Sequence, residues 1–428
     1  MLLYDSLTRR KQELPPPPGP IRMYVCGPTV YQRIHVGNAR PYVVFLWLKR
    51  WLEHQGYEVT LVENITDVND KIYDAAEKQG IGSAELGKAA TQWYFEDTDE
   101  LGLGRPDHEP LASETIPEIV ALIEELVERG LAYQSQGDVY FRVAAYPDYG
   151  QLSGAKLEDM VAQEPSDLKE DQRDFALWKA TKPNEDTSWP SPWGLGRPGW
   201  HIECSAMAEK LLGPVFDIHG GGLDLRFPHH ENELAQSRGA GREFARLWSH
   251  NGMLELAEEK MSKSLGNIVS LREVLDAYGS EAILVLFLGA HYRSPLEYSD
   301  EAMESARTQA DDFRTAFRVV QRSGDAPPWD ELAAALDDDF NTPLALSILH
   351  AWRSAGELEL LERGLRIFGL EVEAAPDVPE AVAVLAELRL EARARRDFER
   401  ADELRADIER LGWEIQDVAD GFRLVPKS

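Results

Sequence analysis

Four side chains that can bind a soft metal ion stand at three separate places in the chain. Cys26 ends an apolar run, Cys204 lies in the middle of residues 198–205, and His229 and Glu233 are four residues apart. The spacing of four places the last two on one face of a helix. Two thiolates, an imidazole and a carboxylate form a set that suits zinc and is softer than magnesium accepts.

The spacing of these residues leaves three alternatives open. Cys26 and Cys204 are the only cysteines among 428 residues, and free cysteines are most often ordinary small residues of a core. The four residues can also hold a closed structural zinc rather than a catalytic one. Finally, His230 lies three residues before Glu233 and can replace His229 as the ligand.

A short word with a histidine and a glycine, His35-Val36-Gly37-Asn38, stands where a predicted strand turns into a helix. A glycine at this point lets a flat base approach the backbone, and a helix N-terminus favours phosphate. The histidine can donate to phosphate oxygens. The word is weak alone, because a histidine at a helix start is more often a cap or a surface residue.

A second word, Lys260-Met261-Ser262-Lys263-Ser264, follows the last predicted strand of the sheet and lies in a loop. Two lysines one helical turn apart on a mobile loop can close over a triphosphate. There they would neutralise the charge that builds as the α-phosphate is attacked. A five-residue word after a parallel-sheet pattern is much more specific than a pair of lysines.

The elements that must position these residues alternate between strand and helix, which predicts a parallel sheet with ligands at the carboxyl ends of its strands. An insertion, residues 105–193, splits the sheet into two halves; it begins with a helix and two short strands and continues as a polar, proline-rich stretch. Beyond about residue 300 the periodicity predicts a separate helical domain, with a hairpin at 413–425. The predicted sheet strands are residues 21–26, 57–64, 215–219 and 247–251.

The two words together resemble the paired nucleotide-binding signatures of class I aminoacyl-tRNA synthetases. Longer strings are similar to the cysteinyl-tRNA synthetase family, collinear over nearly the whole chain. Asn38 departs from the class I signature, which often has a second histidine there, and leaves the phosphate contacts to His35. The similar strings are residues 26–31, 64–67, 198–205, 216–222, 227–233 and 338–343, together with Asp224.

The resemblance implies roles for individual residues. One zinc ion per chain would be bound by Cys26, Cys204, His229 and Glu233, which decides between the two histidines. The cysteine pocket would be lined by Thr66, Trp200 and His219. ATP, with Mg²⁺, would be bound by His35, Gly37, Asn38, Gly222, Asp224 and Lys263. The catalytic residues would be His35, Lys260 and Lys263.

The implied reaction has two steps, activation of L-cysteine with ATP to cysteinyl-adenylate and transfer to the 3′-terminal adenosine of tRNA(Cys). Cysteine and serine differ by one atom, and pocket shape gains only about 1 to 3 kcal/mol from such differences. Zinc binds a thiolate far better than a hydroxyl. We therefore expect no editing domain.

The resemblance also implies an α/β fold, a split Rossmann-type parallel sheet with an insertion and a C-terminal helical domain. The expected domains are residues 1–104, the first half of the catalytic domain; 105–193, a connective insertion; 194–255, the second half with the zinc site; 256–299, the lysine-word loop and stem-contact region; and 300–428, the helical anticodon-binding and C-terminal region.

The composition sets limits on location and partners. The net charge of -30 argues against a nucleic-acid partner, but a basic track on one face can coexist with an acidic remainder. No run approaches the roughly 20 apolar residues that span a bilayer, so no membrane partner is expected. With two distant cysteines we expect no disulfides and a reducing, cytoplasmic setting. A monomer is the family expectation.

Two other functions are compatible with parts of this pattern. The ligase that joins cysteine to an amino sugar in mycothiol synthesis shares the zinc set and the nucleotide words, but residues 397–422 resemble the synthetase's own C-terminus. A catalytically idle, zinc-stabilised tRNA-binding relative is the second alternative, and the intact Lys260 and Lys263 argue against it.

Overall fold

The computed structural model describes residues 1–160, 164–183, 185–256, 269–317, 326–370, 378–418 and 421–427. The chain forms two compact units. The first unit comprises Met1–Ala277 and Tyr292–Tyr298, and the second comprises Tyr278–His291 and Ser299–Ser428. Lys260 and Lys263 lie outside the described residues.

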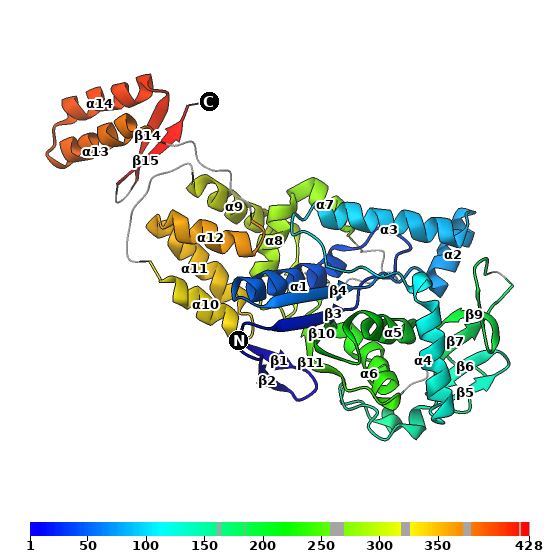
Figure 1. Ribbon diagram of the computed structural model, residues 1–428. Coiled ribbons are helices and arrows are strands. Elements are labelled where there is room, and N and C mark those ends of the chain that lie inside the picture. The colour runs from blue at the N-terminus through cyan, green and yellow to red at the C-terminus, as the bar shows by residue number, and fades with distance from the viewer. Residues whose placement is uncertain are drawn as a thin grey trace. The chain divides into compact units, whose positions relative to one another are not determined.

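A four-stranded parallel sheet forms the centre of the first unit (Figure 1). Its strands read as apolar runs, and Ile21, Met23 and Tyr24 are fully buried, as expected when a parallel sheet is covered on both faces. Two strands precede the insertion and two follow it, so the predicted fold class is confirmed. In sheet order the strands are β11 (Phe244–Asn251), β10 (Val215–Gly222), β3 (Pro20–Val25) and β4 (Glu58–Glu63).

Three helices beside this sheet position the site: α1 (Val36–His54), α5 (Trp200–Leu212) and α6 (His229–Gly239) (Figure 1). Helix α1 lies so close to β10 that a Cβ at Gly220 would overlap the Phe45 ring. Helix α5 buries Met207 in one apolar cluster with Tyr24 of β3. The three helices thus hold their first turns at the carboxyl edge of the sheet.

The insertion carries helix α4 (Ile116–Glu128) and an antiparallel sheet. The helix packs Ile119, Ile123 and Leu126 into a core with Phe141 and Trp178 of the sheet. Two of its strands lie in the stretch that the sequence pattern presented as polar and proline-rich, and a third begins directly after residue 193, the predicted end of the insertion. In sheet order the strands are β5 (Ala132–Ser135), β6 (Asp138–Phe141), β7 (Phe175–Ala180), β9 (Gly194–Pro198) and β8 (Trp189–Ser191).

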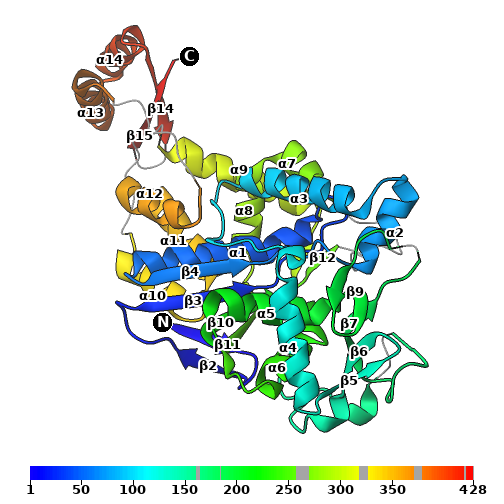
Figure 2. The same cartoon turned by 45° about the vertical axis from the view of Figure 1, so that its right-hand side comes forward.

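The remaining elements of the first unit flank the parallel sheet (Figure 2). Strands β1 and β2 pair as a hairpin, and β12 pairs in parallel with β13. Helix α2 begins at a capped position, because the Asn69 side chain accepts from the Lys71 amide. These elements are β1 (Leu2–Asp5), β2 (Arg10–Glu13), α2 (Asp70–Gln79), α3 (Ser83–Asp99), β12 (Leu254–Leu256), α7 (Leu271–Tyr278) and β13 (Leu296–Tyr298).

The second unit is helical and ends in an antiparallel hairpin, β14 (Trp413–Val418) and β15 (Gly421–Pro426). Side-chain caps start three of its helices, with Ser299, Asn341 and Asp397 each accepting from a backbone amide three residues on. Its helices are α8 (Ser280–Leu288), α9 (Asp300–Ala316), α10 (Trp329–Asp337), α11 (Thr342–Ala355), α12 (Leu358–Ile367), α13 (Glu380–Ala394) and α14 (Phe398–Arg410).

Among the described residues, no helix has both the length and the apolar character needed to cross a membrane.

Candidate active site and metal centre

The four candidate metal ligands come together in a buried cluster. One ligand atom of each of Cys26, Cys204, His229 and Glu233 lies within 4.8 Å of the others. Cys26 directly follows β3, Cys204 lies on α5, and the other two occupy the first turns of α6. The Cys26 thiol donates to Glu233 Oε1 at 3.3 Å, and His229 Nε2 lies 3.1 Å from the same oxygen.

A second set of donors overlaps the first. Ligand atoms of Cys26, His219, His230 and Glu233 also lie within 4.8 Å of one another. His219 Nε2 is 2.8 Å from Glu233 Oε2, and His230 Nδ1 is 2.9 Å from His250 Nε2. Only the set with His229 uses both cysteines, but distances alone allow either histidine, as the spacing did.

The electrostatics of the cluster suit a divalent cation. Burial, followed by Cys204 and Glu233, raises the pKa of the Cys26 thiol well above its ordinary value. Burial also lowers the pKa of the His229 imidazole well below its ordinary value, so the ring is neutral and able to bind a metal. A bound cation reverses the thiol shift because it stabilises thiolates. The donor types and their proximity therefore fit zinc.

The three residues predicted for the cysteine pocket surround this cluster. The Trp200 ring stacks on His229, with centroids 4.2 Å apart, and His219 contacts Glu233 as described above. Thr66 is linked more indirectly, because its hydroxyl accepts from Asn64 Nδ2 at 3.2 Å, while Asn64 Oδ1 accepts from the Cys204 thiol at 3.5 Å. All three thus lie within one or two contacts of the candidate ligands.

A cavity of about 390 Å³ runs along the carboxyl edge of the parallel sheet next to the cluster. It is lined by Cys26 and Trp200 of the cluster and by five of the residues predicted to bind ATP. These five are His35, Gly37, Asn38, Gly222 and Asp224. The cavity therefore places Trp200, one of the predicted cysteine-pocket residues, beside five of the predicted nucleotide residues.

His35 stands directly before α1 with a ring nitrogen available to a ligand. Its Nδ1 is buried and has no hydrogen-bond partner in the described part of the chain. Burial lowers the pKa of His35, and the Asp224 carboxylate opposes that shift. A neutral imidazole at a helix N-terminus can donate one hydrogen bond to a phosphate oxygen.

Lys260 and Lys263 lie outside the described residues, and the description resumes at Val269. The Val36 amide donates to Val269 O at 3.1 Å, and the Leu271 amide donates to Ile34 O at 2.8 Å. Val269 and Leu271 are therefore hydrogen-bonded to the backbone on either side of His35.

Several polar residues of the cavity wall escaped the sequence analysis, and two of them end strands of the parallel sheet. Glu63 is the last residue of β4 and Asn251 is the last residue of β11. Glu63 Oε1 accepts from the Tyr94 hydroxyl at 2.8 Å. The available signal was their position, because ligands of parallel α/β sheets bind at the carboxyl ends of strands.

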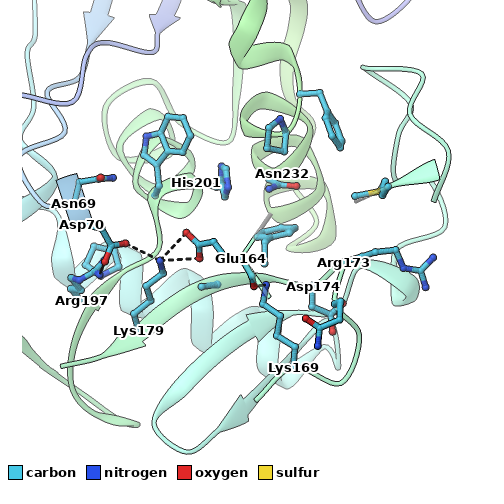
Figure 3. A pocket seen from close by; sticks show the side chains of 18 of the residues that line it. Asn69, Asp70, Glu164, Lys169, Arg173, Asp174, Lys179, Arg197, His201 and Asn232 are labelled. Atoms are coloured by element: carbon cyan, nitrogen blue, oxygen red, sulfur yellow. Dashed lines mark hydrogen bonds and ion pairs between the residues drawn. The ribbon is translucent and has the colours of Figure 1, made fainter. Parts of the chain in front are cut away.

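A second cavity, of about 330 Å³, lies beside the insertion and shares Lys71 and Trp200 with the first. Figure 3 shows Lys179 in its wall, paired with Asp70 and Glu164. Five cationic side chains against three acidic ones make this wall net positive in a strongly acidic chain. They are Lys71, Lys169, Arg173, Lys179 and Arg197, and Asp70, Glu164 and Asp174.

Family models and curated relatives that match this chain all point to one family. Residues 15–308 match the family described as tRNA synthetases class I (C) catalytic domain, and residues 331–355 match the DALR domain. A cysteine–tRNA ligase of Cupriavidus taiwanensis is 47% identical over 98% of this chain and 97% of its own length. One of Pelotomaculum thermopropionicum is 42% identical over 99% of each chain.

Solved structures agree on the fold. A Mycobacterium tuberculosis methionyl-tRNA synthetase in complex with methionyl-adenylate superposes with a TM-score of 0.55 at 16% identity, covering 87% of this chain and 84% of its own. The LeuRS of Agrobacterium radiobacter K84, in a ternary complex, gives 0.58 at 12% identity, covering 82% and 84%.

These matches confirm the predicted family and enzyme class, and the cysteine–tRNA ligase relatives favour the synthetase over the amino-sugar ligase. The chain belongs to the class I tRNA synthetases and, within them, to the cysteine–tRNA ligase family.

Proposed function

We propose that this cysteine–tRNA ligase selects its amino acid with one zinc ion held by Cys26, Cys204, His229 and Glu233. The observation that carries the proposal is the convergence of these four donors within 4.8 Å, all buried, from three separate elements. When bound, zinc would hold the substrate thiol as a thiolate, for which a serine hydroxyl is a poor substitute.

The chain's own side chains orient the amino acid around that point. Trp200 stacks on His229 and also lines the nucleotide cavity, so its ring can form the wall between the thiol end and the carboxylate end of cysteine. His219 fixes the Glu233 carboxylate from its other oxygen, at 2.8 Å. Thr66 completes the pocket.

In the first step the cysteine carboxylate attacks the α-phosphate of ATP, and no side-chain nucleophile is required. His35 donates to a phosphate oxygen from the start of α1, and Asp224 accepts from the ribose hydroxyls. Gly37, Asn38 and Gly222 let the nucleotide approach the backbone. Lys260 and Lys263 neutralise the charge on the phosphates, which arrive with Mg²⁺.

In the second step a ribose hydroxyl of the 3′-terminal adenosine of tRNA(Cys) attacks the cysteinyl-adenylate. The net positive wall of the second cavity supports the approach of an RNA end from the insertion, despite the overall charge of -30. We assign anticodon binding to the helical region 300–428, and the lysine-word loop and the stem-contact region to 256–299. We expect a monomer that acts in the cytoplasm.

The proposal is tested by cysteine-dependent ATP–pyrophosphate exchange on zinc-replete protein, with serine in place of cysteine as the control, followed by charging of bulk tRNA. We expect exchange with cysteine, little with serine, and labelled cysteinyl-tRNA. Equal exchange with serine would overturn zinc selection. Exchange without charging would remove the tRNA step, and no exchange would contradict the assigned nucleotide site.

A further inference from the structure

Asn251 presents a hydrogen-bond acceptor at the wall of the nucleotide cavity, and no donor among the described residues fills it. It ends β11, is only 3% exposed and lines the cavity. Its Oδ1 is buried and has no hydrogen-bond partner within the described ranges. Leaving such an atom unpaired is unfavourable, so an empty acceptor at a cavity wall indicates a ligand that donates to it.

The neighbouring backbone fixes which end of the amide is free. Asn251 Nδ2 donates to the Gly252 carbonyl oxygen at 3.1 Å, and Arg40 Nη1 donates to the same oxygen at 2.7 Å. Turning the amide over would put Oδ1 against that oxygen, acceptor against acceptor. Oδ1 is therefore the atom left for a ligand.

The position of this acceptor is rigid. The fully buried Arg40 guanidinium also donates to Ser294 O at 2.9 Å, and Gly252 packs so closely on Ser294 that a Cβ would overlap its carbonyl group. The residue that carries the free acceptor is thus anchored through its neighbour. A preorganised acceptor discriminates between ligands better than a mobile one.

The sheet register relates Asn251 to the proposed ribose site. Asn251 is paired with Gly222 of β10, and Asp224, the proposed ribose contact, follows Gly222 by two residues. Beyond Asn251, Gly252, Met253 and Leu254 continue the cavity wall. A base attached to a ribose at Asp224 has this wall within reach, one strand further along the sheet edge.

We infer that Asn251 Oδ1 accepts a hydrogen bond from the exocyclic amino group of adenine, which makes Asn251 a specificity-determining residue for ATP. Guanine carries a carbonyl oxygen at the same ring position, so it would face Oδ1 with a second acceptor. Buried polar groups left unpaired are an effective way to reject an analogue. The inference rests on the proposed function only in placing ATP in this cavity.

The test is a double-mutant cycle in which Asn251 is changed on the protein and the exocyclic amino group is removed from the nucleotide. Cysteine-dependent exchange is measured with ATP and with purine riboside triphosphate, which lacks the amino group, for the wild type and Asn251→Leu. We expect the wild type to lose about tenfold in kcat/KM without the amino group. In Asn251→Leu the two nucleotides should perform equally, because the amino group has no partner left.

Ser249→Ala is the matched control. Ser249 lies two residues earlier on β11, is 1% exposed and has an Oγ without a partner among the described residues, but it is not part of the cavity lining. This variant should keep the preference for ATP. Asn251→Ala repeats the test if Asn251→Leu does not fold.

Two results would overturn the inference: equal use of both nucleotides by the wild type, or an undiminished preference for ATP in the Asn251 variants. The second result would also mean that the amino group is read by another part of the chain. Failure of wild-type exchange with ATP itself would instead count against the proposed function.

Discussion

At the metal centre the four proposed ligands lie against one another, whereas the wall of the nucleotide cavity next to it includes buried atoms that have no partner in the described part of the protein. Cys26, His229 and Glu233 are linked by contacts of 3.1 to 3.3 Å. Along the cavity, His35 Nδ1, Glu63 Oε2 and Asn251 Oδ1 are all buried and unpaired.

The difference matches what each region has to recognise. A metal centre tests one atom of a small amino acid, so its ligands must be gathered before the substrate arrives. A nucleotide carries its own donors, acceptors and charges. Its site therefore provides room beside the backbone and protein atoms that are free to form hydrogen bonds with the ligand. The two regions meet at Cys26 and Trp200, which line the cavity and belong to the cluster or pack on it.

The largest expected effect comes from removing one metal ligand. Cys204→Ser should release zinc and lower cysteine-dependent exchange by more than about 100-fold, because even groups that only support a ligand account for about 10- to 100-fold. Discrimination against serine should disappear with the metal. Metal content and exchange are measured on the same sample, and Ser205→Ala, on the next residue of α5, should retain both. Zinc and selectivity that survive in Cys204→Ser would contradict the assigned ligand set.

The second largest effect is expected at the nucleotide site, without loss of zinc. Lys263→Ala removes charge neutralisation at the phosphates and should lower the exchange rate by about 10²- to 10³-fold, with zinc content unchanged. Lys78→Ala, which removes an exposed lysine of α2, is the control. Loss of zinc in Lys263→Ala would contradict the claim that the metal centre and the nucleotide site act independently.

A smaller effect is expected where the regions meet. Trp200→Ala removes the ring that stacks on His229 and should raise the KM for cysteine about 3- to 10-fold, as aromatic pairs contribute about 0.5–1.5 kcal/mol. Zinc content and the KM for ATP should change less. A larger effect on ATP than on cysteine would assign Trp200 to the nucleotide.

The last effect concerns stability at the cavity wall rather than activity. Burial raises the pKa of Glu63 from 4.5 to about 8, so between these values the folded protein keeps a proton that the unfolded chain loses. Stability therefore falls as the pH rises through this window, by up to ~1.4 kcal/mol per pH unit. Glu63→Gln stays neutral, so its melting temperature relative to the wild type should be higher at pH 8 than at pH 5.5. The exposed Glu77→Gln should show no such trend, and parallel behaviour of Glu63→Gln would refute the raised pKa.

The parallel sheet could be predicted because its strands are continuous apolar runs. The predicted residues 21–26 and 57–64 overlap β3 (Pro20–Val25) and β4 (Glu58–Glu63) almost completely. Strand β10 continues through Gly220–Gly222, beyond the predicted 215–219. These glycines have low strand propensity, and their strand conformation comes from pairing with the neighbouring strands.

The insertion was harder to predict. Strands β8 and β9 carry proline and glycine, which local propensity assigns to loops, and they are held by cross-strand pairing and by packing on Trp178. This pairing joins segments that are apart in the sequence, so the local residue pattern does not predict it.

Part of the candidate site could likewise be predicted from the sequence and part could not. The spacing of His229 and Glu233 predicted a shared helix face, but His230 is also buried and also has a ligand atom within 4.8 Å of those of Cys26 and Glu233. Only the resemblance distinguishes the two histidines. Glu63 and Asn251 escaped prediction because a single polar residue at a strand end looks the same whether it meets a ligand or solvent.

The claim that cysteine is recognised by its thiol at the metal centre, and not by pocket shape, is tested most directly by observing the metal. Cobalt replaces zinc in tetrahedral sites and reports each thiolate ligand through a charge-transfer absorption band. Adding cysteine to the cobalt-substituted protein should increase this band, while serine at the same concentration should leave it unchanged. No change with cysteine, at a concentration that supports ATP–pyrophosphate exchange, would contradict the account.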